Sequence, residues 1–445
     1  MTAAAAAAPA KPIDMTRVVL TSLAASSIEW YDFFIYGTAA ALVFPKLFFA
    51  AGLPPAVAQL ASFSTFAVGF IARPVGGVVF GHFGDKLGRK RALVTAMLMM
   101  GLATTAVGLL PSYATIGVAA PLILIVLRFL QGLAVGGQWG GAALLAIENA
   151  PVQRRGFFGS FAQMGVPAGV ITANLIFLVM GAVVAPAAFA AWAWRIPFLL
   201  SILLVGLSLY VQLKLEDTAE FQALQKQEVK PPKTVSPVLS VIARHPKEIL
   251  LAAGSFVAAN GTFYVMITYA VAYSTSTLHL PKSMILWAVM IGSVISAPIL
   301  PLTAALSDRF GRRGVFLAGA VLELLWAAPF FLLLNTGQFP AMVLALTGGL
   351  AFNSVMYGLQ AAMMTEMFST EFRYSGASLG YQLGAICAGG FAPIIATALF
   401  ARYHTAMAIS GYMAVLCAIS FLSVLVLTET HKRENRMPAR AKATA

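Results

Sequence analysis

The sequence predicts an all-α membrane protein in which twelve transmembrane helices form two pseudo-symmetric six-helix bundles. Of its 445 residues, 60% are apolar and only 10% are charged, and the mean hydropathy is +0.85. A soluble domain with about 25% charged residues would have to place nearly half of these apolar side chains on its own surface, so the surrounding solvent must be largely lipid. Twelve long apolar runs follow one another along the chain, and motifs in the first half recur in the second.

Each apolar run is long enough to cross a bilayer, since a helix of about 20 residues spans the hydrocarbon core. Helices are required there because they satisfy their own backbone hydrogen bonds. The first run contains Glu29 and Asp32 and has no clean cleavage site, so we expect a first helix and no signal peptide. In chain order, the expected spans are 20–48, 56–80, 92–110, 120–147, 157–183, 195–214, 249–276, 284–306, 315–334, 340–366, 374–400 and 405–427.

Positive charge is distributed unequally between the loops. When alternate loops are counted from a cytoplasmic start, 23 of the 29 lysine and arginine residues fall on one side and 4 on the other, with Arg73 and Arg128 inside the membrane. Cytoplasmic loops are the ones rich in lysine and arginine, so both termini are expected to be cytoplasmic. The net charge of +13 thus reports membrane topology, and we expect no nucleic-acid partner.

One long polar stretch divides the chain into two halves. It contains the pair Pro231 and Pro232, and its first part, 215–227, has the pattern of an amphipathic surface helix. The cysteines Cys387 and Cys417 lie in apolar runs without partner spacing, which excludes a disulfide framework and a metal site. The expected organisation is a disordered cytoplasmic tail at 1–16, a six-helix bundle at 17–215, a cytoplasmic linker at 216–247, a second six-helix bundle at 248–427 and a short basic tail at 428–445.

Three motifs recur between the halves at a nearly constant offset. Asp85-Lys-Leu-Gly88-Arg89-Lys90 returns as Asp308-Arg-Phe-Gly311-Arg312-Arg313, 223 residues later. Glu148 and Arg155 return as Glu366 and Arg373, and Gln163-Met-Gly165 returns as Gln382-Leu-Gly384. Two parallel six-helix repeats place a substrate site between them, near the bilayer midplane.

With these motifs the chain resembles the major facilitator superfamily, and within it the metabolite:proton symporters, over essentially its whole length. The run from Thr365 through Arg373 to Gln382 is most similar to the shikimate-type permeases. The resemblance implies the major facilitator fold, alternating access, a proton gradient as the energy source, no cofactor, a monomer and a bacterial inner membrane. Its other motifs are Glu29-Trp-Tyr-Asp32-Phe, Phe70-Ile-Ala-Arg73-Pro74-Val-Gly76-Gly77, Arg128-Phe-Leu-Gln131-Gly132, Gly136-Gly137-Gln138-Trp139-Gly140-Gly141 and Trp194-Arg195-Ile-Pro197-Phe198.

Two departures from the family pattern bear on the substrate. Several acid-carrying relatives have glutamate where this chain has Gln138, so a carboxylate for proton handling is missing there. Osmosensing carriers often bear a long C-terminal extension, whereas eighteen residues follow the last expected span here. We therefore expect proton-coupled import of a small organic acid, either shikimate-like, a dicarboxylate or an aromatic carboxylate. Proton-coupled uptake of proline or betaine is the alternative.

Four charged residues inside the expected spans are the candidate proton-coupling groups: Glu29, Asp32, Arg73 and Arg128. Glu29, Asp32 and Tyr36 share one helix face, and each intramembrane charge needs a partner, a cavity or a proton. We expect protonation of Asp32 or Glu29 to release an arginine, whose planar fork then binds a substrate carboxylate. The alternative interpretation is a permanent salt bridge that only fixes the helices.

Polar side chains at helical spacing complete the expected substrate cavity. Each could instead be a hydrogen bond between helices, typically worth under about 2 kcal/mol. Glu323 falls in the middle of a run with no evident partner. The substrate-binding candidates are Arg128, Tyr36, Gln138, Trp139, Gln163, Tyr264, Asn353, Gln360 and Gln382, with Asn174, Asn260 and Tyr357 also in reach.

The repeated motif around Asp85 and Asp308 has a separate expected role. An aspartate can cap the N-terminus of a facing helix, and an arginine can pair with a carboxylate of the other half. The family resemblance implies that these positions form a cytoplasmic gate, although simple positive-inside anchoring explains some of the cations. The gate candidates are Asp85, Gly88, Arg89, Glu148, Arg155, Asp308, Gly311, Arg312, Glu366 and Arg373.

Two further functions are disfavoured by the residues. Drug/proton antiporters resemble G-x-x-x-G-P in the fifth helix, but here Ala162 and Val166 occupy the glycine positions before Pro167. A membrane enzyme or receptor would need a nucleophile triad, a metal-spaced histidine pair, a P-loop or a sizeable soluble domain, and the sequence has none of these. We therefore expect a transporter and no enzyme.

Overall fold

The computed structural model describes residues 15–87, 89–136, 147, 150–215, 237–368 and 373–430, and the secondary structure of these residues is helical. Within these described ranges, nine helical segments are long and apolar enough to cross a membrane, and the helices α1, α4 and α11 bring the number to the expected twelve. The first half consists of α1 (Met15–Leu42), α3 (Pro55–Leu87), α4 (Arg89–Leu109), α6 (Ala119–Gly136), α8 (Arg155–Gln163) continued by α9 (Gly165–Val183), and α11 (Ile196–Leu215).

The second half has the same number of spans, three of which are interrupted. The short elements that connect the spans lie mostly in the first half. They are the helices α2 (Phe44–Leu47), α5 (Tyr113–Ile116) and α10 (Pro186–Ala191) and the 3₁₀ turns η1 (Val152–Arg154) and η2 (Ala193–Arg195), and the helix α13 (Pro237–Arg244) precedes the second half. The spans are α14 (Pro246–Tyr264), η3 (Val265–Tyr269) and α15 (Ala270–Ser276); α16 (Lys282–Ser296) and α17 (Ile299–Phe310); α18 (Arg312–Leu334); α19 (Phe339–Met367); α20 (Arg373–Gly384), η4 (Ala385–Gly390) and α21 (Ala392–Tyr403); and α22 (Met407–Val426).

The predicted spans agree with these helices except where the helices continue further or break. Helix α3 extends to Leu87, so the backbone of Asp85 is helical instead of lying in a loop. The eighth span breaks between α16 and α17 at Pro298, a residue that has no N–H to donate. The predicted amphipathic helix at 215–227 lies almost entirely outside the described residues, as do most of both predicted tails.

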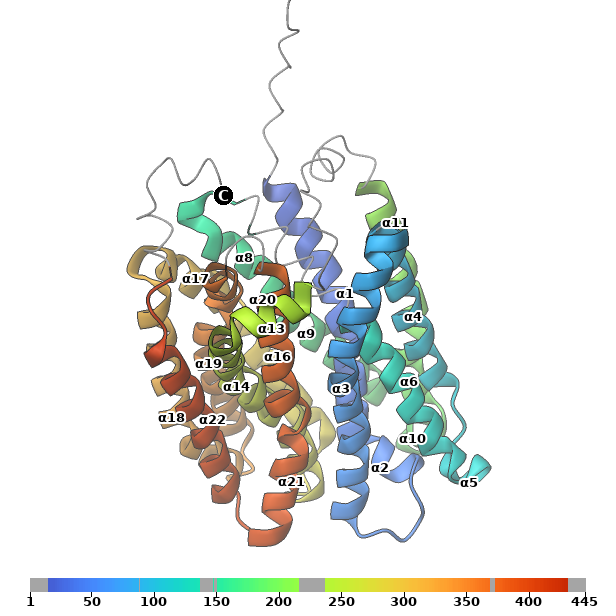
Figure 1. The fold of residues 1–445 in the computed structure, drawn as a ribbon. Helices are drawn as coiled ribbons and strands as arrows, with labels where there is room; N and C mark the ends of the chain where they lie inside the picture. The colour runs from blue at the N-terminus through green and yellow to red at the C-terminus, as the bar shows by residue number, and fades with distance from the viewer. Residues whose placement is uncertain are drawn as a thin grey trace, which may run out of the picture.

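The two halves lie side by side, and the axes of their long helices are roughly parallel to one another, with successive spans alternating in chain direction (Figure 1). At the end where α1 begins, here called the termini end, α8 packs against α17 and α19. Toward the opposite end, α3 packs against η4 and α21, and α9 packs along α16. The described residues of the two halves therefore contact each other both at the termini end and toward the opposite end. One apolar core contains residues of both halves.

Small residues allow the helices of the first half to approach closely. A Cβ atom on Gly76 or Gly136 of the α3–α6 pair would collide with the backbone of the facing helix, as would one on Gly132. Close backbone contact of this kind replaces the hydrophobic driving force that lipid cannot supply. The outer faces carry large apolar side chains such as Val183, Leu250 and Leu325, each more than half exposed, as a lipid-facing surface requires.

Two of the interrupted spans contain π-helical turns, which are rare and often found at functional sites. η3 follows Tyr264 directly, and η4 follows Gly384. Both lie against the first half, since η3 contacts α1 and η4 contacts α3. They therefore mark the same region as the buried charges described next.

Candidate functional site

Two buried arginines from neighbouring helices occupy the middle of the first half. Arg73 of α3 and Arg128 of α6 are 0% and 1% exposed, and their positive charges are close enough to repel each other. The guanidinium carbon of Arg73 lies 4.4 Å from the ring centre of Phe70 and 4.7 Å from that of Phe33, while that of Arg128 lies 4.3 Å from the Phe33 ring centre. Aromatic faces stabilise cations without neutralising them.

We call these aromatic residues the ring cage: Trp30, Phe33, Tyr36, Phe66 and Phe70. A ring that covers the flat face of a guanidinium leaves its N–H edge available for a carboxylate. The side-chain nitrogens of Arg73 have no hydrogen bond of ordinary geometry within the described residues. Arg128 differs, because its Nη1 donates to Oε1 of Gln131 at 3.0 Å.

The second half completes the surroundings of Arg73. The hydroxyl groups of Tyr264 and Tyr381 face its guanidinium, and the Tyr264 ring centre lies 5.2 Å from that of Phe70. Tyr264 is therefore where expected, in contact with the site between the halves. Arg73 is the arginine closer to the interface, and Arg128 lies deeper in the first half beside Tyr36, whose hydroxyl donates to Thr65 at 2.8 Å.

The two acids of α1 face different neighbouring helices, contrary to the expectation that both would face the arginines. Glu29 lies in charge-interaction range of Arg73, although no direct ion pair joins the two side chains in the described structure. Asp32, which is 2% exposed, instead faces Ser201 of α11. Residues three apart on a helix differ by about 60° in direction, which is enough to aim them at different neighbouring helices.

Two of the predicted polar residues reach the space between the halves. Nε2 of Gln163 donates to the backbone oxygen of Tyr357 across the interface, at 3.4 Å. Asn353 lines a small cavity between the halves, together with Pro167, Phe263, Ser293 and Tyr357. These positions agree with a substrate pathway at mid-depth.

Other predicted ligands instead hold helices together. Gln360 donates to the backbone oxygen of Ser255 at 3.0 Å, and Asn174 accepts from Thr38 at 3.2 Å. Asn260 donates within its own helix to Phe256 at 3.1 Å. Gln382 is buried with its Oε1 unpartnered in the described residues. Gln138 and Trp139 lie outside the described residues.

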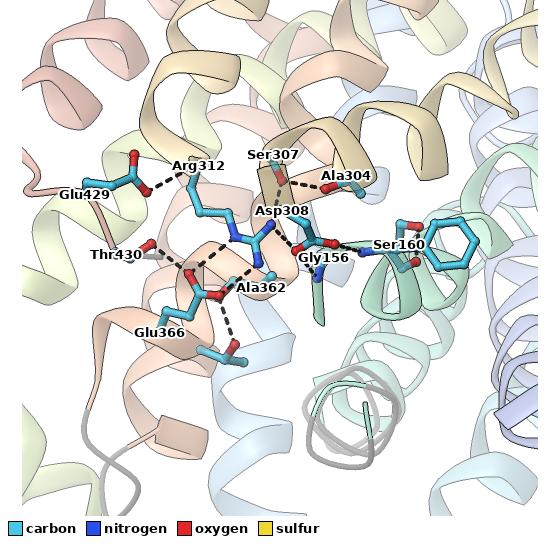
Figure 2. Close-up of polar contacts among 12 residues, drawn as sticks. Gly156, Ser160, Ala304, Ser307, Asp308, Arg312, Ala362, Glu366, Glu429 and Thr430 are labelled. Carbon is cyan, nitrogen blue, oxygen red and sulfur yellow. Dashed lines mark hydrogen bonds and ion pairs between the residues drawn. The ribbon is translucent and has the colours of Figure 1, made fainter. Parts of the chain in front are cut away.

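A second polar cluster joins the two halves at the termini end of the interface. Both carboxylate oxygens of Asp308, on α17, accept backbone N–H groups at the start of α8, from Gly156 and Phe157 at 2.9 Å each (Figure 2). Helix N-termini carry unpaired N–H groups and a positive dipole, so a carboxylate is their natural cap. The aspartate of one half thus caps a helix of the other half.

Arg312 holds the rest of this cluster together. Figure 2 shows its guanidinium between Asp308, with Nη1 and Oδ1 at 2.6 Å, and Glu366, with Nη2 and Oε1 at 3.0 Å. Glu366 also accepts from the Thr430 hydroxyl at 2.8 Å, and Glu429 accepts from the backbone N–H of Arg312 at 2.9 Å. We call Asp308, Arg312, Glu366, Glu429 and Thr430 the gate cluster.

The remaining gate predictions are only partly covered by the described structure. Gly311 has φ of +103°, a left-handed conformation that favours glycine, and it joins α17 to α18. Glu148 and Gly88 lie outside the described residues, and nothing is described of the side chains of Asp85, Arg89 and Arg373. Arg155 begins α8, next to the N–H groups that Asp308 caps.

Sequence reasoning missed several members of both sites. Glu429 and Thr430 lie in the segment expected to be a solvated tail, yet they bind the gate cluster. No sequence signal pointed to them, because both residues lie far along the chain from their partners Arg312 and Glu366. Phe66 was not singled out at all, because a phenylalanine in an apolar helix looks like ordinary core.

Gly156→Ala is expected to open the termini end. A Cβ at this position would meet the Arg312 guanidinium and would lie 2.7 Å from Oδ1 of Asp308, so α8 and α17 must separate. Overpacking costs about 1–3 kcal/mol, enough to shift the balance of conformations by roughly 5- to 150-fold. Transport assays in vesicles and protease accessibility at the termini end measure the effect.

Gly181→Ala is the matched control, because nothing lies within 4 Å of a Cβ on that exposed glycine. It is expected to leave both readouts unchanged. Equal effects of the two substitutions would contradict the packing argument.

Comparison with known proteins identifies the family. The family described as "Sugar (and other) transporter" matches residues 18–236, and "Major Facilitator Superfamily" matches residues 251–444. The chain is 40% identical over 421 residues to the shikimate transporter of Escherichia coli K12, covering 94% of this chain and 95% of that protein. It is similarly 40% identical over 422 residues to the inner membrane metabolite transport protein YhjE of the same strain, covering 93% and 94% of the two chains.

More distant relatives and solved structures give the same fold. The chain is 32% identical over 428 residues to the proline/betaine transporter of Escherichia coli K12, covering 94% of this chain and 84% of that protein. A crystal structure of the D-xylose-proton symporter superposes with a TM-score of 0.70 at 17% identity, over 94% of this chain and 98% of the other. The chain is thus a multi-pass inner membrane protein and no enzyme. It belongs to the major facilitator superfamily of membrane transporters.

Proposed function

We propose that this transporter imports a small organic acid together with a proton, using the proton gradient and no cofactor. The observation that carries the proposal is Arg73, a fully buried cation that makes no direct ion pair and whose side-chain nitrogens have no hydrogen bond of ordinary geometry in the described residues. A buried guanidinium without a paired anion is costly, and a substrate carboxylate would supply two acceptors in the matching geometry. The 40% identical relative named for shikimate, a carboxylic acid, supports an acid as the substrate.

The proton is assigned to Glu29 because the carboxyl group of this residue lies within electrostatic interaction range of the Arg73 guanidinium. A negative Glu29 attracts the guanidinium, whereas a protonated Glu29 leaves Arg73 to the incoming anion. Proton and anion then favour each other's binding, and such reciprocal coupling is the thermodynamic basis of symport. This proposal transfers to Glu29 the role that the sequence had also offered to Asp32.

Alternating access then uses the gate cluster and the central cavity. We assign the termini end to the cytoplasm, since the loops at that end carry most of the lysine and arginine. With the gate cluster formed, that side is closed. Opening it requires Asp308 to leave the N-terminus of α8, after which substrate at mid-depth can escape to the cytoplasm. A monomer suffices, because both halves of the site come from one chain.

The competing substrate class is proline or betaine, which the 32% identical relatives are named for. Aromatic rings also bind quaternary ammonium groups, so the ring cage is the observation that favours this alternative. In this chain, however, those rings already cover the guanidinium groups of Arg73 and Arg128. A ligand that adds positive charge there would be repelled.

A thermal-shift panel on the purified protein tests the proposal. It compares shikimate, α-ketoglutarate, citrate, benzoate, proline and betaine at mildly acidic and neutral pH, because a ligand of the folded state raises its melting temperature. We expect one carboxylic acid to stabilise the protein, and more strongly at the lower pH, where Glu29 is protonated more often. Stabilisation by betaine or proline alone would refute the organic acid and leave a compatible-solute carrier.

A further inference from the structure

A buried acid in the second half takes no part in the mechanism described so far. Glu323 lies in the middle of α18 and is 1% exposed. Its carboxyl group faces Thr262 of α14, Asn353 of α19 and Cys417 of α22. No hydrogen bond of ordinary geometry reaches either carboxyl oxygen within the described structure. Such a group in a membrane protein is expected to have a function.

The hydrogen bonds of its neighbours leave no donor for an ionised Glu323. Asn353 uses both hydrogens of its amide nitrogen, toward the backbone oxygen of Ala259 at 3.0 Å and toward Oγ1 of Thr262 at 3.1 Å. The single hydroxyl hydrogen of Thr262 goes to the backbone oxygen of Ala258 at 2.8 Å. Neither neighbour therefore has a hydrogen left to donate to a carboxylate at position 323, whereas a protonated carboxyl group can donate to their oxygens.

Charged groups are also absent around Glu323 in the described residues. The cations of its own helix, Arg312 and Arg313, lie at the start of α18, ten or more residues and roughly 15 Å away, and are bound there. The acids of α17 and α19, Asp308 and Glu366, belong to the gate cluster at the same end. The titratable group that faces Glu323 from α22 is the thiol of Cys417, which offers no positive charge.

Asn353 connects this acid to the central cavity. It faces Glu323 from one side, and it lines the cavity between the halves from the other, with Ser293, Ser296 and Ser354 nearby. A cavity lined by hydroxyl and amide groups can hold water, which conducts protons. If α19 shifts relative to α18 as the halves rock, Asn353 is the side chain whose movement admits water to Glu323.

We propose that Glu323 is a second proton-carrying site, separate from Glu29 and reached from the central cavity through Asn353. In the closed arrangement it is a neutral carboxylic acid. When the cavity opens, its O–H proton passes to cavity water and leaves a carboxylate, which regains one proton from water on the other side of the membrane. This inference rests on proton-coupled transport in general, but it does not depend on which compound is carried.

Infrared spectroscopy tests the resting state without any substrate. At neutral pH the wild-type protein is expected to show the carbonyl stretch of a protonated carboxyl group, and this band is expected to be missing in Glu323→Gln. An equally strong band in wild type and variant would overturn the assignment. Glu29→Gln is the matched control, since it changes the other candidate acid and leaves the Glu323 band in place.

Transport measurements test the proton-carrying role. The compound is whichever member of the thermal-shift panel stabilises the wild type, whether acid, proline or betaine. In Glu323→Gln, accumulation driven by a pH gradient is expected to fall at least about fivefold, the size of an ordinary coupling free energy. Exchange of labelled for unlabelled substrate across the vesicle membrane should persist, because exchange needs no net proton movement. Gradient-driven accumulation at the wild-type level would overturn the proposal.

A second substitution guards against a purely structural role. Glu323→Leu removes the acid but breaks no hydrogen bond of ordinary geometry within the described residues, so its melting temperature is expected to stay at or above the wild-type value while gradient-driven accumulation is lost. If both variants failed to fold, Glu323 would be a structural residue and the proposal would be refuted. If no panel carboxylate bound the wild type, the organic-acid proposal would fail alone.

Discussion

Replacing Arg73 with lysine is expected to abolish substrate stabilisation and to lower uptake by roughly 10–100-fold, the equivalent of one charge-assisted hydrogen bond of about 1.5–3 kcal/mol. Lysine keeps the positive charge but loses the planar fork that binds a carboxylate through two parallel bonds. It also cannot spread over Phe33 and Phe70, whose ring centres lie 4.7 Å and 4.4 Å from the Arg73 guanidinium carbon. Uptake into vesicles and the thermal-shift response to the panel compound measure the two effects.

Arg195→Lys is the matched control for this substitution. Arg195 also lies over an aromatic ring, with its guanidinium carbon 4.6 Å from the ring centre of Trp194, but it is far more exposed and donates to the backbone oxygens of Ala191 and Leu110. We expect wild-type uptake from it. Uptake by Arg73→Lys at the level of this control would show that charge alone, without the fork, serves the site.

Arg312→Ala is expected to be the most destabilising single substitution in the gate cluster. The 1% exposed guanidinium bridges Asp308 and Glu366, and its removal leaves two largely buried carboxylates facing each other without a cation. Breaking a buried ion pair from one side costs about 3–5 kcal/mol. A lower melting temperature and loss of uptake are the expected readouts, since an unpaired Asp308 is repelled by Glu366 as α17 and α19 approach.

The adjacent Arg313→Ala separates this effect from a general loss of positive charge. Arg313 donates one side-chain hydrogen bond, to the backbone oxygen of Leu425 at 2.6 Å, in an exposed position. Its replacement is expected to cost no more than about 1.5 kcal/mol, the usual worth of a single hydrogen bond. A fall in melting temperature as large as that of Arg312→Ala would mean that the ion pairs of Arg312 contribute little.

The fold could be predicted from the sequence because membrane spans are fixed by length and apolar composition. Element ends were harder, since Pro298 and the two π turns interrupt runs that are apolar throughout, and hydropathy is insensitive to such breaks. The repeated motifs predicted an aspartate that caps a facing helix but not which helix, and in the structure Asp308 caps α8 of the other half. Glu429 lay beyond this reasoning, because a capping contact depends on where a chain end returns in space.

The sequence could predict which charged residues belong to the candidate substrate site, but not which acid faces which arginine. Buried charges are conspicuous in apolar helices, so Glu29, Asp32, Arg73 and Arg128 were all found. Which acid meets which base depends on the rotation of α1 against α3 and α11, and small differences in rotation decide it. The aromatic faces that surround the arginines are even less visible in sequence, where they cannot be told from core.

The π turns η3 and η4 also alter how the second half is interpreted. A π turn contains one residue more than an α turn, so every side chain beyond it is rotated by about 100° relative to a continuous helix. A scanning experiment that follows an unbroken 3.6-residue pattern from Asn260 or Gln382 would therefore assign the residues of α15 and α21 to the wrong face. For the same reason, an alignment of the two halves needs a one-residue gap at each turn before equivalent positions can be compared.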